Sequence, residues 1–376
     1  MILYGDLPPV GRKISLQVSS ENKLMKSLPE HQYWVDSGTS ALALALLDAK
    51  NYFPHLARPR AIIPGYCCPD LVAACVFAGV EPIAVDIEKN DPTYDLELLR
   101  AVMDETVVAV IAINFLGVSE RITKIRELIA QSGLQTRLIA DNAQWFPVSH
   151  DQMKFDTDYA TFSFGRGKPV SLLGGGLLLS KMPLDKNCLK NICESADKPA
   201  LIKLEARAYN LLLIPQLYML LNRNPFMHLG ETKYSPLEKI TKMDGYRTSL
   251  LSENFFSYSR HERHLQQEYN RVTADGLQQF AAIYSDRCVR LLRYPLLCPD
   301  PQTRDSLLKN MQKKGLGATA MYKASIDQIE GVGNLISLPK PLDNAKSFAN
   351  RFMTLPLYSG ISPVLQAEIV SLLKAH

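Results

Sequence analysis

The sequence from residue 139 to residue 144 reads Ile139-Ala140-Asp141-Asn142-Ala143-Gln144, and that from 162 to 168 reads Phe162-Ser163-Phe164-Gly165-Arg166-Gly167-Lys168. Each segment begins with the end of a short apolar run, typical of a strand buried on both faces, and each finishes in polar or charged side chains. In open sheets of parallel strands, ligands bind beside the carboxyl ends of the strands. We therefore expect the carboxylate of Asp141 and the amine of Lys168 to lie at one ligand site.

The chain around these segments alternates between helix-forming and strand-forming stretches. The expected helices span residues 40–50, 71–78, 96–103 and 122–131, and the expected strands span 60–64, 82–87, 107–114, 137–141, 160–164 and 172–180. Gly79 suits the C-terminus of the second of these helices. The alternation predicts an α/β fold with a mostly parallel sheet covered by helices on both faces.

The character of the sequence changes after Tyr246. A long polar helical stretch over 253–280 is followed by a predicted strand over 290–297 and predicted helices over 304–314 and 362–375. We predict three parts on this basis. They are an N-terminal arm (1–35), a large α/β domain (36–245), and a linking helix with a smaller C-terminal α+β domain (246–376).

Composition indicates a globular protein that does not bind nucleic acid. The 376 residues are 47% hydrophobic and carry 42 basic and 38 acidic side chains, a net charge of +4 without long like-charge blocks. The seven cysteines form no CxxC pair, which argues against a disulfide framework and a structural zinc site and suggests a reduced cytoplasm. Residues 1–26 lack the apolar core of a secretory signal.

One apolar stretch, residues 209–221, raises the question of membrane association. It is shorter than the ~20 residues that a bilayer span requires, and Asn210, Pro215 and Gln216 interrupt it. We expect a helix pair packed within the protein or at a subunit contact, in preference to a helix on a membrane surface.

A phosphate-binding helix start is predicted at Ser37-Gly38-Thr39-Ser40. Backbone N–H groups and hydroxyls at a helix N-terminus point toward one place, and the helix dipole favours an anion there. An ordinary N-cap explains the same four residues about equally well. The hydroxyl of Ser163 is a second candidate for the phosphate.

Asp141 and Lys168 complete the requirements for pyridoxal phosphate. A carboxylate at the end of a buried strand needs a cationic partner, and a protonated pyridine nitrogen is one, although a salt bridge to Arg166 or Lys168 would also serve. An amine shielded from water beside buried strands is a nucleophile toward an aldehyde. The order of these groups along the chain predicts covalent aldehyde chemistry at Lys168.

Several motifs together resemble the DegT/DnrJ/StrS aminotransferases, which are fold-type-I pyridoxal-phosphate transferases. Those motifs are Ser37-Gly38-Thr39-Ser40-Ala41-Leu42, Ile62-Ile63-Pro64-Gly65-Tyr66, Ala78-Gly79-Val80-Glu81-Pro82, Val85-Asp86-Ile87, Asp141-Asn142-Ala143-Gln144, Phe162-Ser163-Phe164 with Lys168, and Leu355-Pro356-Leu357. The resemblance implies that Lys168 carries the cofactor, Asp141 pairs with its ring nitrogen and Gln144 lies near its phenolic oxygen. It also implies that Gly38, Thr39 and Ser163 hold the phosphate, with Ser40, Tyr66 and Cys68 as further cofactor contacts.

The same resemblance implies an activity. It predicts transfer of an amino group from an amino acid, glutamate by family likeness, to a keto-sugar that is nucleotide-linked, in polysaccharide or amino-sugar biosynthesis. A cytoplasmic homodimer with shared active sites is expected. The alternatives are a non-catalytic pyridoxal-phosphate-binding protein in a regulatory or assembly role, and a fold-type-I lyase or dehydratase.

The chain departs from the family pattern at three places. Cys68 stands where many relatives have an aromatic residue that stacks on the cofactor ring, a role that Tyr66 or Trp145 could take over. Residues 242–247 replace a loop that in relatives reaches into the neighbouring subunit. The helical segment 188–234 has no counterpart that can be aligned.

Three other patterns predict no separate site. His261 and His264 are three residues apart, whereas the zinc-protease helix spaces its histidines by four, so we expect solvated helix residues. Adjacent Cys67 and Cys68 are expected to pack in the interior. The glycines at 174–176 lack the Lys-Ser or Lys-Thr of a nucleotide P-loop and are expected to allow close backbone approach near Lys168.

Overall fold

A seven-stranded sheet forms the centre of the chain in the computed structural model, which describes residues 5–19, 28–29, 31–149, 151–153, 155–223, 232–260, 264–272 and 290–375. The strand order is β1-β7-β6-β5-β4-β2-β3. The strands are β1 (Gln32–Val35), β2 (Arg60–Pro64), β3 (Glu81–Val85), β4 (Val107–Ile113), β5 (Arg137–Asp141), β6 (Tyr159–Ser163) and β7 (Gly176–Ser180).

The five strands from β3 to β6 along this order run parallel to one another. Strand β7 is antiparallel to β6, and β1 is antiparallel to β7, so β7 alone opposes the rest of the sheet. Nearly every residue of β4 is buried, as expected for a strand covered on both faces. The predicted α/β fold with a mostly parallel sheet is confirmed.

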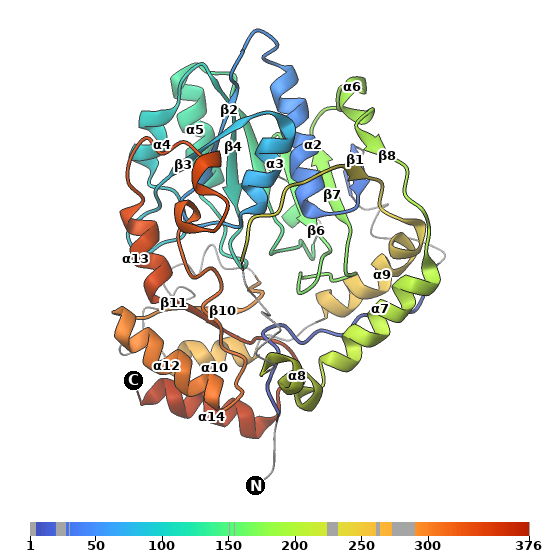
Figure 1. Cartoon of the computed structure of the whole chain (residues 1–376), viewed down its shortest axis with the longest axis vertical. Coiled ribbons are helices and arrows are strands. Elements are labelled where there is room, and N and C mark those ends of the chain that lie inside the picture. The colour runs from blue at the N-terminus through green and yellow to red at the C-terminus, as the bar shows by residue number, and fades with distance from the viewer. Residues whose placement is uncertain are drawn as a thin grey trace.

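The helices of the sheet region lie around it in the upper part of Figure 1. They are α2 (Gly38–Asn51), α3 (Asp70–Ala78), α4 (Leu96–Val102), α5 (Ile122–Ser132) and the short α6 (Lys186–Leu189). Helix α2 is rich in alanine and leucine and is buried along most of its length against α3, β6 and β7. Gly79 ends α3 with a φ of 64°, the left-handed conformation that was expected for it.

The C-terminal elements form a second apolar cluster below the sheet (Figure 1). Strands β10 (Tyr294–Leu297) and β11 (Phe352–Leu355) pair antiparallel, accompanied by α10 (His264–Val272), α12 (Pro301–Lys313) and α14 (Pro363–Lys374). The buried apolar residues of α13 (Asp343–Arg351) belong instead to the cluster of the sheet region. The carboxylate of Asp86, just past β3, accepts the backbone N–H groups of Asn344 and Ala345, each at 2.8 Å. This contact joins α13 to the sheet region.

The segment between β7 and the C-terminal elements contains α7 (Pro199–Leu212), α8 (Pro215–Asn222) and α9 (Gly245–Ser259). Two-residue strands β8 (Ile192–Cys193) and β9 (Ile240–Thr241) pair in parallel, and 3₁₀ turns occur at Asp151–Met153, Ile326–Gln328 and Gly333–Leu335. Figure 1 shows α7 at the lower right of the molecule, with α9 beside it and α8 near the bottom centre.

Two asparagines fasten the N-terminal segment to these helices. Asn210 of α7 accepts the N–H of Ile14 and donates to its carbonyl, both at 2.8 Å. Asn254 of α9 does the same for the backbone of Ser15, at 2.9 and 3.0 Å. Each amide therefore satisfies both backbone groups of one residue, as a neighbouring strand would.

The predicted strands and helices of the sheet region are confirmed, with differences at some boundaries. The strand expected over 172–180 begins only at Gly176, because Leu173 and Gly175 adopt φ angles of 61° and 100° that an extended strand cannot contain. A single helix was expected over 253–280, but α9 begins earlier, at Gly245, and already ends at Ser259. Residues 261–263 and 273–289 lie outside the described residues. Strands β1 and β11 and helix α13 were not predicted.

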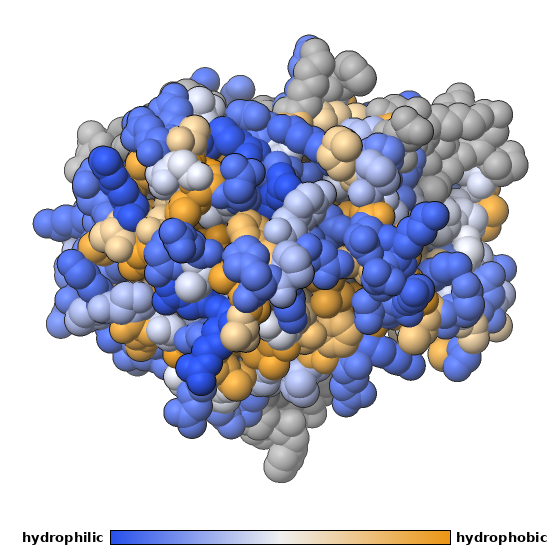
Figure 2. All heavy atoms as spheres, turned by 90° about the horizontal axis from the view of Figure 1, so that it is seen from above, coloured by the Kyte–Doolittle hydropathy of each residue, from blue (hydrophilic) through white to orange (hydrophobic). Residues whose placement is uncertain are grey.

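The surface seen in Figure 2 consists mostly of hydrophilic residues, with hydrophobic residues showing between them. Among the described residues, no helix combines the length and the apolar character needed to cross a bilayer.

Candidate active site

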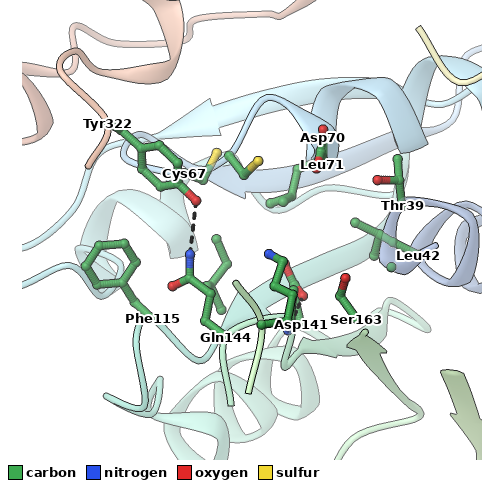
Figure 3. A pocket seen from close by; sticks show the side chains of 15 residues that line it. Thr39, Leu42, Cys67, Asp70, Leu71, Phe115, Asp141, Gln144, Ser163 and Tyr322 are labelled. Carbon is green, nitrogen blue, oxygen red and sulfur yellow. Dashed lines mark hydrogen bonds between the residues drawn. The ribbon is translucent and has the colours of Figure 1, made fainter. Parts of the chain in front are cut away.

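One pocket, which is partly open to solvent, lies at the carboxyl ends of the parallel strands. Its lining consists of Gly38, Thr39, Leu42, Cys67, Cys68, Asp70, Leu71, Ile113, Phe115, Asp141, Ala143, Gln144, Ser163, Lys168 and Tyr322. In Figure 3, Thr39, Leu42 and Ser163 lie at one end, Phe115, Gln144 and Tyr322 lie at the other, and Asp141 lies between them.

The end at Thr39 and Ser163 has the properties of an anion site. Ser37 caps α2 by accepting the N–H of Ser40 at 3.0 Å, so the N-terminus of a 14-residue helix points at the pocket. A Cβ at Gly38 would lie 2.6 Å from the Cβ of Ser163, which explains the glycine. The hydroxyl of Ser163 and the start of α2 are thus held close together beside an open space.

Residues 37–40 were expected either to bind phosphate or to form an ordinary N-cap, and different residues among the four fit each expectation. Ser37 is an ordinary N-cap, and its hydroxyl also pairs with that of Ser40 at 2.9 Å. Ser40 is fully buried and is not part of the lining, so direct cofactor contact by Ser40 is not supported. Gly38 and Thr39 line the pocket as predicted.

Asp141 is the last residue of β5, and its carboxylate is buried. Burial raises the pKa of Asp141, and the nearby Asp70 adds to that rise, whereas the N–H of Ala143 at 2.9 Å and the charge of Lys168 act against it. The ionised carboxylate is therefore only partly compensated by the protein. A cationic ring nitrogen at this position would supply the missing partner.

Lys168 lies in the turn that follows β6 and reaches the same pocket. Its N–H donates to the carbonyl of Gly165 at 3.3 Å, and Gly167 has a φ of 70° that favours glycine. Burial raises the pKa of Tyr209 on α7, and the nearby Arg166 and the backbone of Gly167 act against that rise, so α7 lies beside this turn. Sequence reasoning missed Tyr209, because its segment matched no known pattern.

Gln144 and Tyr322 form the opposite end of the pocket, where a dashed line joins them in Figure 3. The Oε1 atom of Gln144 accepts the N–H of Leu116 at 2.8 Å, which fixes the orientation of the amide. Its Nε2 atom then donates to the hydroxyl of Tyr322 at 3.1 Å. Burial raises the pKa of Tyr322, so the phenol stays protonated and its own hydrogen is available to a ligand. Tyr322 was not predicted, because it follows a loop without a motif.

The three residues considered for a place over the cofactor ring differ in position. Cys68 lines the pocket, and burial, with a contribution from Asp70, raises the pKa of its thiol to about 12. Tyr66 is not part of the lining: its ring packs against Phe348, and its hydroxyl donates to the carbonyl of Tyr322 at 2.9 Å. Trp145 is buried outside the lining as well. The structure therefore does not support Tyr66 as a cofactor contact, or either aromatic residue as a substitute for Cys68.

Asp70 is a second carboxylate at the pocket that the sequence did not single out. It opens α3 and is exposed, unlike Asp141. Figure 3 shows it beside Leu71, across the pocket from Asp141. The site thus contains one buried and one exposed carboxylate near a single lysine.

Two of the remaining sequence patterns have clear structural roles. A Cβ at Gly176 would lie 2.0 Å from the carbonyl oxygen of Ser37, so this glycine allows the close backbone approach that was expected, at the turn before α2. In the segment 242–247, Asp244 caps α9, and Arg247 donates to Asp244 at 2.6 Å and to the carbonyl of Leu172 at 3.1 Å. These contacts keep Arg247 within its own chain.

Of the two histidines in the predicted helix, His261 lies outside the described residues, as do residues 262 and 263. Only the backbone of His264 is described. The part of the chain that is described contains no group of three or more His, Cys, Asp or Glu side chains that could hold a metal ion.

The chain is similar to known aminotransferases. The sequence profile of the DegT/DnrJ/EryC1/StrS aminotransferase family matches residues 25–198 and 251–374. A curated relative, the dTDP-3-amino-3,4,6-trideoxy-α-D-glucose transaminase of Micromonospora megalomicea subsp. nigra, is 28% identical over 149 residues. That match spans 39% of this chain and only 38% of the relative.

Solved structures show the same fold at low sequence identity. DesV of S. venezuelae is 17% identical, with a TM-score of 0.66 over 93% of this chain and 86% of its own. PseC of Helicobacter pylori, an aminotransferase involved in the biosynthesis of pseudoaminic acid, is 16% identical, with a TM-score of 0.67 over 98% of this chain and 97% of its own.

The residues present fit pyridoxal phosphate. The anion site at the start of α2, the undercompensated carboxylate of Asp141 and the amine of Lys168 line one pocket, and each matches one chemical group of that cofactor. The family profile covers well over half of the chain. The chain belongs to the DegT/DnrJ/EryC1/StrS aminotransferase family, whose enzymes use pyridoxal phosphate.

Proposed function

We propose that this protein is an aminotransferase that moves an amino group from an amino acid to a nucleotide-linked keto-sugar. The observation that carries the proposal is the single pocket shared by Lys168, Asp141 and the anion site at Thr39 and Ser163. Pyridoxal phosphate supplies an electron-withdrawing ring that stabilises negative charge on the carbon next to the transferred nitrogen. The site residues explain how such a ring is held and where protons move.

Binding and orientation are assigned to the two ends of the pocket and to its middle. Gly38, Thr39 and Ser163 hold the phosphate, with the dipole of α2 adding to its attraction. Asp141 holds the ring nitrogen in its cationic form, because the buried carboxylate otherwise lacks full compensation. Gln144, whose amide is oriented by Leu116 and Tyr322, is proposed to lie near the phenolic oxygen, as the resemblance implies.

Lys168 has two tasks in this proposal. Its Nζ atom would hold the cofactor covalently through the aldehyde carbon, with release of water. When an amino substrate occupies that carbon instead, the freed Nζ atom would take the proton from the α-carbon of the donor and, in the second half-reaction, deliver a proton to the acceptor carbon. The backbone N–H of Lys168 donates to the carbonyl of Gly165 within its turn, and Tyr209 lies beside this turn.

The substrates are proposed from the family and its relatives. Glutamate is the proposed donor, and the acceptor is a keto-sugar carried on a nucleotide, in polysaccharide or amino-sugar biosynthesis. A curated relative is named for transamination of a dTDP-linked sugar, and PseC takes part in making a sugar acid. Incubation with a panel of nucleotide keto-sugars and mass spectrometry of the products would identify the acceptor.

A specific observation favours one competing function. Cys68 stands where many relatives have the aromatic residue that stacks on the cofactor ring. Neither Tyr66 nor Trp145 lines the pocket in its place. A protein that binds the cofactor without transferring amino groups would tolerate this loss. A lyase or dehydratase is favoured less, because relatives that dehydrate often lack the lysine that Lys168 provides.

The experiment that separates these functions uses the cofactor-loaded protein and glutamate. The proposal predicts that the absorbance of the lysine-bound cofactor converts to that of pyridoxamine phosphate, with release of 2-oxoglutarate. An unchanged spectrum at saturating glutamate would instead support the non-catalytic function. The Lys168→Ala variant serves as the control, since it cannot move the proton.

We also propose the organisation of the molecule in the cell. The arm (1–35), the large domain (36–245) and the C-terminal part (246–376) are proposed as its units, with β1 belonging to the sheet rather than to the arm. A cytoplasmic homodimer with active sites shared between subunits is proposed. The free cysteines among the described residues support a reducing compartment.

A further inference from the structure

Arg293 is a partly buried cation without an acid beside it. It directly precedes β10, and its Nη1 atom donates to the hydroxyl of Thr319 at 3.0 Å. Its Nε atom is buried and has no hydrogen-bond partner. No aspartate or glutamate of the described ranges forms an ion pair with this guanidinium. Since a guanidinium stays charged at neutral pH, holding one out of water is costly unless an anion compensates it.

The main chain holds the segment before Arg293 at the Gln144 end of the pocket. The N–H of Leu292 donates to the carbonyl of Leu116 at 2.8 Å. The N–H of Leu116 donates in turn to the Oε1 atom of Gln144, also at 2.8 Å. In Figure 3 this end lies away from Thr39 at the start of α2. Arg293 is therefore not part of the anion site that is proposed for the cofactor phosphate.

Three tyrosines near the guanidinium connect it to the active site. Burial lowers the pKa of Arg293, and the nearby Tyr322, Tyr218 and Tyr209 act against that change. Tyr322 lines the pocket, and Tyr209 lies beside the turn at Gly167 that precedes the reactive lysine. The guanidinium thus lies close to both the pocket lining and the lysine turn.

None of these phenols neutralises the guanidinium. Burial raises the pKa of Tyr322, Tyr218 and Tyr209, so all three are uncharged at neutral pH. Asp6 lies near Tyr218, but its carboxylate pairs with Arg223 at 2.7 Å. An uncharged phenol can instead donate a hydrogen bond to an anion beside the guanidinium. Tyr322 can do so because its hydroxyl accepts from Gln144 and keeps its own hydrogen.

Both proposed substrates carry an anionic oxygen group that fits such a place. An amino acid donor has a carboxylate, and a nucleotide-linked sugar has phosphates. A guanidinium binds either group through charge-assisted hydrogen bonds, often two at once. The partner that Arg293 lacks within the protein is therefore of the kind that a substrate would bring.

We propose that Arg293, together with the hydroxyl of Tyr322, binds the anionic oxygen group of a substrate at the Gln144 end of the pocket. This inference rests on the proposed function, because it assigns one part of a substrate to a residue of the same site. It makes Arg293 a residue that determines substrate specificity.

The test is the binding of unreactive fragments to the cofactor-loaded protein, measured by isothermal titration calorimetry. Glutarate is the carboxylate probe, and inorganic pyrophosphate is the phosphate probe. The wild type is expected to bind at least one of them. Arg293→Gln should weaken that binding about tenfold or more, the effect of losing a charge-assisted hydrogen bond. Arg293→Lys keeps the charge and should recover part of the affinity. A loss with glutarate assigns the site to the donor, and a loss with pyrophosphate assigns it to the nucleotide.

Arg304 offers a matched control in the same part of the chain. Its Nη1 atom donates to the carbonyls of Ala349 and Phe352, both at 3.2 Å, and its Nε atom pairs with Asp305 at 2.7 Å. Arg304→Gln should therefore lower the melting temperature and leave probe binding unchanged. Arg293→Gln removes an uncompensated charge, so its melting temperature without probe should equal or exceed that of the wild type.

Three results would overturn the inference. They are a wild type that binds neither probe, an Arg293→Gln variant that binds both probes as tightly as the wild type, and an Arg293→Gln variant that melts well below the wild type. Reaction with glutamate is followed separately through the cofactor absorbance. A wild type that binds a probe through Arg293 but leaves the cofactor unconverted would keep the anion site and contradict the proposed aminotransferase.

Discussion

At the scale of single residues, Asp141 combines a structural cost with a chemical role. Its carboxylate lies at the end of a buried strand, and burial raises its pKa above the ordinary value. The folded chain therefore binds a proton at Asp141 more readily than the unfolded chain does. The stability linked to that proton is present at acid pH and is lost as the pH rises through the pKa of the folded state.

This sign gives a prediction for Asp141→Asn without cofactor. The variant should have a higher melting temperature than the wild type at neutral pH, and the difference should shrink as the pH is lowered, because only the wild type loses the linked stability. Transfer activity with cofactor should fall about 10²-fold or more. Differential scanning calorimetry from pH 4 to pH 8 checks the first part. A variant that melts lower than the wild type at neutral pH would show that the carboxylate is fully satisfied by the protein.

Tyr322 was not predicted from the sequence, and its position in the pocket leads to a specific prediction. Its hydroxyl accepts from Gln144, so its own hydrogen can only serve a ligand or water. Tyr322→Phe keeps the ring and should lower kcat/KM about 3- to 10-fold, as expected for one lost hydrogen bond. The cofactor absorbance should shift as well, because Gln144 loses its partner. If the variant has the same cofactor spectrum and the same steady-state rates as the wild type, the hydroxyl of Tyr322 has no role in the site.

At the scale of elements, the start of α2 performs two functions with neighbouring residues. Ser37 caps the helix, whereas Thr39 lines the pocket. Ser37→Ala should lower the free energy of unfolding by about 1 kcal/mol, the usual effect of losing an N-cap. Thr39→Ala should leave stability nearly unchanged and weaken cofactor binding. Chemical denaturation and cofactor titration of both variants measure the two effects, and equal effects of the two variants in both assays would contradict this division.

The sheet was predictable because its signals are local. Buried parallel strands such as β4 are continuous apolar runs, and helices such as α3 end at a glycine. Strand β1 was missed because it is half-buried at the sheet edge and carries no such run. The start of β7 was placed too early because the apolar residues at 172–173 continue the pattern, although their backbone turns through positive φ at Leu173.

The candidate site was predictable where a motif carries it. Asp141, Ser163 and Lys168 follow strands in a recognisable order, and all three line the pocket. Tyr322 lines the pocket and Tyr209 lies beside the turn at Gly167. Both come from distant parts of the chain by tertiary packing, which local sequence cannot encode. Tyr66 does not line the pocket for the same reason, since its ring packs against Phe348 in the core.

At the scale of the whole molecule, the N-terminal segment is held by two amide side chains. Asn254 bonds both backbone groups of Ser15 and also donates to the carbonyl of Leu250 at 2.9 Å. Asn254→Ala should lower the free energy of unfolding by about 1–3 kcal/mol, because buried backbone groups lose their partners. It should also increase hydrogen exchange at residues 14 and 15. Unchanged protection there would show that the segment is held by other contacts.

The central claim is that this fold brings together a phosphate-binding helix start, a buried acid and one reactive lysine around pyridoxal phosphate. The most direct measurement is reduction of the cofactor-loaded protein with borohydride, followed by digestion and mass spectrometry. We predict a single reduced adduct on the peptide that contains Lys168, absent from the Lys168→Ala variant. An adduct on another lysine, or none at all in a protein that has bound the cofactor, would contradict the account.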